Sequence, residues 1–424
     1  MHVLVAPGRF DARLDDGPAR PRGVPAADPW PALTAPEAVD AVVRGWREGA
    51  PGDVLVPLPL SDGGAGLVDA VRAARGGELL SVTTTDAHGA VVPGAVLVVQ
   101  EPSGARTAYV DGALALGAAD PDARPVTDTT SAGLGTLLAA ALGTGAGRVV
   151  VGLGGRRTVA HDAGAGMLAA LGAAPSRAAD GIGAASGLGA GDLPALPALR
   201  EALAGRDLVA LHAHDLPLTG LGGVSADLAE SGRVDAGTAQ EAERAVAAFA
   251  HAAASAGGTG GRVDLLGGHG AGDRGAVRWA PGAARSAGSR EALAPGSGAG
   301  GGAAFALGLL GARLVEGAAW VADAVDLAAR VAEADLVVTG SGVLDASALE
   351  HGVVGAVARA ALPLGVPAVA VAAQLRTGRR DWGAAGLAGG FAVLERPEDA
   401  VRWRLDPAAA LRARVPRIAR TWSR

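Results

Sequence analysis

The sequence contains no lysine, so all 37 of its basic residues are arginine. A lysine ammonium on the β- and γ-phosphates is part of the Walker A loop, and a lysine amine is required for Schiff-base catalysis. The absence of lysine therefore excludes both of these enzyme classes.

Cysteine is also absent, which excludes disulfide bridges, thiolate catalysis and cysteine-ligated zinc. The net charge of −6 provides no basic field that would hold a nucleic acid by counterion release. Apolar runs are interrupted well short of the roughly 18 residues of a membrane span, and the N-terminal residues lack the basic region of a signal peptide. We expect a cytoplasmic protein that binds neither nucleic acid nor membrane.

Short, β-branched apolar runs alternate with alanine- and leucine-rich stretches of helical period. This alternation indicates an α/β protein with mostly parallel sheets, in which ligands bind at the carboxyl ends of the strands. The length of 424 residues suggests two or three domains. Strands are expected at 2–6, 54–59, 96–99, 148–153, 208–212, 336–339 and 366–371, and helices at 36–46, 66–75, 134–142, 163–171, 238–254, 303–310 and 325–334.

Glycine is abundant, at 67 residues, and is concentrated in two long low-complexity stretches and at strand-to-loop junctions. The stretches 11–30 and 256–302 are so rich in Gly, Pro, Asp, Ser and Arg that we expect mobile surface loops there. The arginine-rich tail after 381 contains three tryptophans and is expected to be a terminal helix or arm docked by them.

Glycine also recurs at five strand-to-loop junctions, at 61–66, 129–135, 152–166, 215–220 and 340–345. There it lets backbone N–H groups approach a phosphate, and a following helix N-terminus favours an anion. Carboxylates at such strand ends can hold Mg²⁺ or accept the proton of a substrate hydroxyl. The candidate acids are Asp62, Asp162, Asp215 and Asp345, each of which would otherwise cap a helix.

The candidate phosphate-binding residues lie in the same junctions. Their alternative roles are to cap a helix, to permit an unusual backbone conformation, or, for an arginine pair, to be solvated on a loop. They are Gly63, Gly64, Gly66, Thr129, Thr130, Ser131, Gly154, Gly155, Arg156, Arg157, Gly340 and Gly342.

In order and spacing, the junctions resemble the signature segments of the bacterial type I glycerate kinase family. The stretch 296–307 corresponds without a gap to the family segment GAGAAGGLGFAL, and 339–345 corresponds to TGEGRLD. The resemblance implies transfer of a phosphoryl group from ATP to D-glycerate with Mg²⁺, and Asp62 and Asp345 would hold the metal. The ATP phosphates would lie near 63–66 and 340–342.

The resemblance also implies two α/β domains with the site in a cleft between them. Residues 1–84 and 290–424 would form a Rossmann- or flavodoxin-like domain with a parallel sheet, and residues 85–289 would form an inserted domain. The oligomeric state is left open.

Several polar positions of the family pattern differ in this chain. In the first segment the family has Asp, Ser and Lys where this chain has Gly8, Arg9 and Asp11, and His161 stands in place of an Asn. An inserted arginine pair, 156–157, could replace missing lysines, because arginine binds phosphate bidentately. Phosphoryl transfer depends on positioned charges, so an impaired homologue acting as a small-molecule sensor or partner subunit is the alternative.

Histidines suggest one more alternative. His212 and His214 are two residues apart on an expected strand and therefore share one face. Together with His161 or Asp215 they would make a three-ligand site for a metal-dependent hydrolase.

Overall fold

The computed structural model describes residues 1–11, 31–120, 123–155, 158–257 and 288–423. They form two compact units. Unit 1 consists of Met1–Asp62, Asp69–Gly76 and Ala318–Arg424, and unit 2 consists of Gly63–Val68 and Gly77–Gly317. The chain therefore begins in unit 1, builds unit 2 and returns to complete unit 1.

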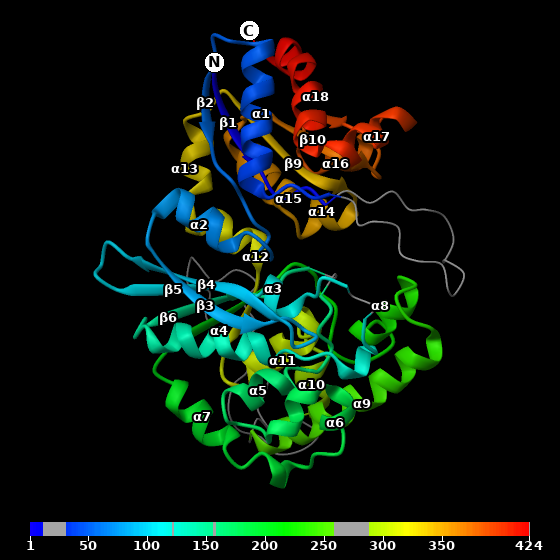
Figure 1. Cartoon of the computed structure of the whole chain (residues 1–424). Coiled ribbons are helices and arrows are strands. Elements are labelled where there is room, and N and C mark those ends of the chain that lie inside the picture. The colour runs from blue at the N-terminus through cyan, green and yellow to red at the C-terminus, as the bar shows by residue number, and fades with distance from the viewer. Residues whose placement is uncertain (12–30, 121–122, 156–157, 258–287, 424) are drawn as a thin grey trace. The chain divides into compact units, whose positions relative to one another are not determined.

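Unit 1 is built on a five-stranded sheet with the order β11-β10-β9-β1-β2, and every pair in it is parallel (Figure 1). Strand β1 lies between β9 and β2 and is apolar and buried from Val3 to Pro7, and Val3 is paired with Leu55 of β2 on one side and Leu336 of β9 on the other. The strands are β1 (His2–Pro7), β2 (Val54–Pro57), β9 (Leu336–Leu344), β10 (Ala368–Leu375) and β11 (Gly389–Ala392).

Helices of unit 1 pack against this sheet and against one another. Figure 1 shows α1 and α18, from the two ends of the chain, side by side. Two glycines of α1 permit this close approach, since a Cβ on Gly45 would lie 2.5 Å from the carbonyl oxygen of Arg412. The helices wholly or mainly in unit 1 are α1 (Ala35–Gly49), α2 (Leu67–Arg75), α12 (Gly317–Ala324), α13 (Leu327–Ala332), α14 (Ala346–Glu350), α15 (Val353–Ala361), α16 (Arg379–Ala384), α17 (Pro397–Leu405) and α18 (Pro407–Trp422).

Unit 2 is built on a six-stranded sheet with the order β3-β4-β5-β6-β7-β8. The first two pairs are antiparallel, and the remaining three are parallel. The strands are β3 (Glu78–Thr85), β4 (Val91–Gln100), β5 (Arg106–Asp111), β6 (Arg148–Gly152), β7 (Asp207–His212) and β8 (Arg313–Glu316).

A single large apolar core fills unit 2, formed by the sheet and the helices around it. Among these helices, α4 packs across β3, β4 and β5. The helices are α3 (Ala113–Leu116), α4 (Ala132–Gly143), α5 (Ala165–Ala170), α6 (Ile182–Ala185), α7 (Leu196–Leu203), α8 (Val224–Glu230), α9 (Ala236–Ala256), α10 (Gly288–Ala292) and α11 (Ala303–Leu309), with a 3-10 turn η4 (Ala299–Gly302) before α11.

The alternating α/β pattern is confirmed, and each expected strand and helix overlaps an observed one. The sequence pattern missed β3, β5, β8 and β11. Its interpretation of the end of 256–302 as a mobile surface loop is wrong, because 296–302 is fully buried. Most of that stretch, and 12–30, lie outside the described residues.

The division between the units differs from the boundaries expected from the sequence. Strand β3 and the segment 290–317 belong to unit 2, because β3 pairs with β4 and β8 pairs with β7. The tail is helical, as expected, and Trp403 is completely buried, stacked on Phe10 with ring centroids 6.2 Å apart. Within the described residues no helix is both long and apolar enough to cross a membrane.

Candidate functional site

The carboxyl ends of the parallel strands of unit 2 meet at one edge of its sheet. Asp111 at the end of β5 is paired with Gly152 at the end of β6, and Gly152 is paired with Leu211 of β7. His212 is paired with Glu316 at the end of β8. The loops that follow β6 and β7 carry two of the junctions singled out in the sequence, 152–166 and 215–220.

Two glycine-rich loops, 63–66 and 152–155, lie side by side at this edge. The N–H of Gly154 donates to the carbonyl oxygen of Gly63 over 3.4 Å. A Cβ on Gly152 would lie 2.5 Å from that same oxygen, so the two loops require glycine where they meet.

The outer residues of the two loops are open. A Cβ placed on Gly66 or on Gly155 would meet no atom within 4 Å. Asp111 fixes the loop 63–66, because its Oδ2 accepts a hydrogen bond from the N–H of Gly66 at 2.7 Å. This geometry leaves space for a ligand phosphate to approach the backbone at these two positions.

Asp111 is a site residue that the sequence pattern missed. Its strand was not among the expected strands, although the run Thr-Ala-Tyr-Val-Asp-Gly ends in an acid and a glycine like the other junctions. Its second oxygen accepts a hydrogen bond from the N–H of Ala113 at 3.0 Å, so the carboxylate links β5, α3 and the loop 63–66.

Asp162 is completely buried and accepts four hydrogen bonds. Its Oδ2 accepts from the N–H and the hydroxyl of Ser131 at 2.8 and 2.9 Å and from the N–H of Gly166 at 2.9 Å. Its Oδ1 accepts from the N–H of Gly164 at 2.9 Å. Burial raises the pKa of the Asp162 carboxyl, and these hydrogen bonds oppose the rise.

The hydroxyl residues before α4 are also buried and engaged within the protein. Thr129 accepts a hydrogen bond from the N–H of His161 at 3.0 Å and donates to the carbonyl oxygen of Val126 at 2.8 Å. Thr130 accepts from the N–H of Ala132 at 3.2 Å. Together with the Asp162 network, these bonds fix the loop 129–131 against the loop 160–166.

The glycine-rich turn η4 packs onto the same loops. The N–H of Ala163 donates to the carbonyl oxygen of Gly301 at 2.9 Å, and a Cβ on Gly301 would lie 1.7 Å from the carbonyl oxygen of Ala160. Small residues at 299–302 therefore allow three loops of unit 2 to pack together.

The three candidate metal-binding histidines are buried, and each has a partner within the protein. The imidazole of His161 lies 2.9 Å from the hydroxyl of Ser225. Nδ1 of His212 lies 3.0 Å from the carbonyl oxygen of His214, and His214 accepts from the N–H of Leu216 at 3.2 Å. Among the described residues no group of three His, Asp or Glu side chains is placed to hold a metal ion, so the hydrolase alternative is not supported.

Asp215 is the second candidate acid in unit 2, and its side chain is more than half exposed. Its carboxylate lies 3.7 Å from Nδ1 of His212. It is therefore accessible to solvent, in contrast to Asp162.

In unit 1, the candidate glycines at the end of β9 are covered by the chain itself. A Cβ on Gly340 would lie 2.2 Å from the carbonyl oxygen of Val371, and one on Gly342 would lie 2.3 Å from the backbone nitrogen of Asp11. Glycine is needed at both positions for close packing of the protein on itself.

The two candidate metal-binding acids of unit 1 differ in their surroundings. Asp345 is the N-cap of α14, and its Oδ1 accepts from the N–H of Ala348 at 2.9 Å. Asp62 is half-buried in the turn directly before Gly63. The candidates Arg156 and Arg157 lie outside the described residues.

Similar proteins and a matching family model indicate the family to which this chain belongs. The model of the Glycerate kinase family matches residues 30–423. A glycerate kinase of Bacillus subtilis is 32% identical over 81% of this chain and 82% of its own length, and a glycerate 2-kinase of Escherichia coli is 29% identical over 81% and 82%. An uncharacterized protein of Mycobacterium bovis is 32% identical over 86% of this chain and 81% of its own.

The fold has a counterpart among solved structures. The crystal structure of a protein from Salmonella typhimurium LT2, assigned as a glycerate kinase 2, aligns with 99% of this chain and 98% of its own. The TM-score is 0.65 at 26% sequence identity. With a family model that matches nearly the whole chain and relatives of this similarity, the protein belongs to the glycerate kinase family.

Proposed function

We propose that this protein transfers the γ-phosphate of ATP to a hydroxyl group of D-glycerate. The observation that carries the proposal is the pair of loops 63–66 and 152–155, which lie together at the carboxyl edge of a sheet with open backbone at Gly66 and Gly155. Ligands of open α/β sheets bind at this edge, and family membership supplies the reaction.

The open loops fit a nucleotide phosphate. A phosphate needs glycine backbone that it can approach closely, and no atom of the described protein fills the space beside Gly66 or Gly155. The chain continues from Gly155 into Arg156 and Arg157, and we assign to this pair the cationic role that lysine plays elsewhere in the family. The loop 340–342 packs on its own unit, so we give it the weaker part in phosphate binding.

The acids of this chain could bind Mg²⁺ together with the phosphates of the nucleotide. Kinase sites hold Mg²⁺ through one or two carboxylates together with substrate phosphates, so a cluster of three protein ligands is not required. Asp62 is half-buried, and we assign it to the metal or to the glycerate hydroxyl. Asp345 has one oxygen engaged at α14 and would contribute through the other. When bound, Mg²⁺ neutralises charge on the transferred group.

The remaining two candidate acids, Asp162 and Asp215, have different surroundings, and we assign them different roles. All four hydrogen bonds of Asp162 go to its own unit, and this favours a structural role that positions the loops. Asp215 is exposed and remains a candidate for contact with glycerate.

A coupled assay of ADP release from ATP and D-glycerate tests the proposal. We expect Asp62→Asn to lower kcat by about 100-fold or more, as loss of a positioned charge does at such sites, with an unchanged melting temperature. The matched control is Asp40→Asn, an exposed acid on α1, which should retain full activity. If the unmodified protein releases no ADP above an ATP-only control with any of a panel of small hydroxy acids, the kinase proposal is wrong.

One observation favours the impaired homologue as a second candidate. Arg9 and Asp11, which stand where the family segment has Ser and Lys, form an ion pair of 2.7 Å with each other. The positive charge of Arg9 is therefore balanced by Asp11 beside it, and this segment has no lysine to place against a nucleotide. Saturable ATP binding in calorimetry without ADP release would favour this sensor role.

A further inference from the structure

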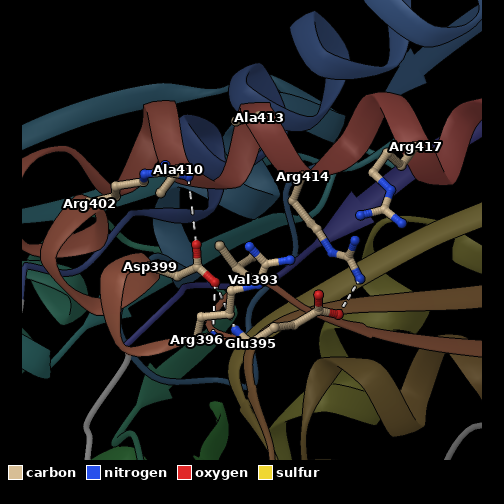
Figure 2. Close-up of a pocket in the computed structure, with 9 residues that line it drawn as sticks. All are labelled: Val393, Glu395, Arg396, Asp399, Arg402, Ala410, Ala413, Arg414 and Arg417. Atoms are coloured by element: carbon tan, nitrogen blue, oxygen red, sulfur yellow. Dashed lines mark hydrogen bonds and ion pairs between the residues drawn. The ribbon is translucent and has the colours of Figure 1, made fainter.

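A pocket of about 200 Å³ lies in unit 1 at the carboxyl end of the edge strand β11, beneath α17 and α18 (Figure 2). No part of the proposed phosphotransfer chemistry uses it. Its lining residues are Val393, Glu395, Arg396, Asp399, Arg402, Ala410, Ala413, Arg414 and Arg417.

The charge of this pocket is positive, because four arginines face two acids. One arginine is fixed in place as part of the wall. The Nε of Arg414 donates to the carbonyl oxygen of Ala392 at 2.7 Å, and its terminal nitrogen lies 2.5 Å from Glu395. The guanidinium also stacks over the ring of Phe391 at 5.9 Å, so Arg414 is held rigidly and neutralises Glu395.

The second acid of the pocket, Asp399, accepts hydrogen bonds from backbone N–H groups. Oδ2 of Asp399 accepts hydrogen bonds from the N–H groups of Glu395 and Arg396, at 3.2 and 2.9 Å, at the start of α17. Its other oxygen lies 3.7 Å from Arg402, whose side chain is 72% exposed. Asp399 therefore leaves much of the charge of Arg402 available to a ligand.

Arg417 is the least engaged cation of the group. It follows Arg414 by three residues on α18, so both guanidinium groups project from the same helix face, as Figure 2 shows. Within the described residues the side chain of Arg417 makes no hydrogen bond or ion pair, in contrast to the dashed contact between Arg414 and Glu395.

We propose that this pocket binds a phosphoryl dianion, either inorganic phosphate or the phosphate group of a small monoester. Arginine presents several N–H donors in one plane and binds phosphate oxygens bidentately. The pocket combines one rigid arginine with three exposed ones. Arg396 lies 3.6 Å from Glu398 and Arg402 lies 3.7 Å from Asp399, so Arg417 adds positive charge that these acids do not balance, and this charge favours an anion. The pocket belongs to unit 1 and shares no residue with the loops 63–66 and 152–155 of unit 2, so the proposal does not rest on the proposed activity.

Titration calorimetry on the full chain, without ATP or glycerate, tests the site with inorganic phosphate and with glycerol 3-phosphate. We expect saturable binding that weakens at least fivefold in Arg417→Gln, because a charge-assisted hydrogen bond is lost. The matched control is Arg420→Gln, an exposed arginine of the same helix that does not line the pocket, and it should bind as the unmodified protein does.

Hydrogen exchange of peptides from 389–417 locates the binding, since phosphate should protect them in the unmodified protein and not in Arg417→Gln. Equal affinity for the two probes identifies free phosphate as sufficient, and tighter binding of the ester identifies a phosphorylated metabolite. Absence of saturable binding, protection elsewhere only, or equal weakening by Arg420→Gln would overturn the proposal.

Discussion

His161 and Asp162 are neighbours in the sequence, and both are buried at the loop edge of unit 2. Burial, together with the nearby charge of Arg233, lowers the pKa of His161 from 6.5 to about 4. The imidazole is therefore neutral in the folded protein at physiological pH. Asp162 is instead surrounded by hydrogen-bond donors.

The His161 shift predicts a pH dependence of stability. Below pH 6.5 the unfolded chain takes up a proton on this residue, and the folded chain does not until about pH 4. The free energy of unfolding should therefore fall by about 2 kcal/mol from pH 7.5 to 5 through this residue. In His161→Asn, denaturant titrations should lack that part of the decrease, and His251→Asn, an exposed histidine on α9, should keep it. Equal slopes in all three proteins would contradict the assignment.

Asp162 should matter for folding rather than for chemistry alone. Asp162→Asn replaces an acceptor oxygen with an amide donor that faces at least one N–H group, so we expect a loss of about 2–4 kcal/mol in the free energy of unfolding. Urea denaturation measures it. The control is Asp180→Asn at an exposed position, which should change stability by less than about 0.5 kcal/mol. Full stability with lost activity would instead favour the catalytic role.

At the scale of elements, the turn η4 illustrates why glycine recurs in this chain. Gly301 has φ +64° and lies against the loop 160–163, whereas Gly311 also has positive φ, +96°, but has open space where a Cβ would be. Gly311→Ala should cost only the backbone strain, about 1–2 kcal/mol. Gly301→Ala adds a clash with a backbone carbonyl, so we expect a much larger loss or failure to fold. Similar melting temperatures for the two variants would be inconsistent with the packing described.

One large side chain anchors α17 in the core of unit 1. The indole of Trp403 in α17 is completely buried, stacks on Phe10 and donates to the carbonyl oxygen of Pro31 at 3.1 Å. Trp403→Ala should cost about 3–5 kcal/mol in urea denaturation. Leu405→Ala, on the same helix and 81% exposed, should cost almost nothing. Comparable losses would contradict the view that packing of this indole anchors α17.

At the scale of the whole molecule, each unit has its own apolar core. The core of unit 2 is drawn entirely from residues between Ala87 and Leu314, and that of unit 1 from the two ends of the chain. We therefore expect a fragment 63–317 to fold alone, with cooperative thermal unfolding followed by circular dichroism. The fragment 1–62 alone should remain unfolded, because it lacks β9 and α18. A molten, non-cooperative fragment 63–317 would contradict the independence of unit 2.

The α/β class and most elements could be predicted from the sequence because period and β-branching are local properties. β8 and β11 were missed because strands of four residues give little periodic signal, and β3 was missed because its outward face is polar. The position of the unit boundary could not be predicted, because it depends on which strand β3 and β8 pair with.

The sequence by itself determined the glycine-rich junctions, their order and the family they belong to, since these depend only on residue types and spacing. The tertiary structure decided which junction residues are open, which acids are committed to hydrogen bonds, and that an arginine-rich tail forms a pocket. The physical reason is that burial and hydrogen bonding depend on partners far along the chain, as with Asp162 and Ser131 or Gly301 and Ala160. Such pairs exist only after the loops have packed.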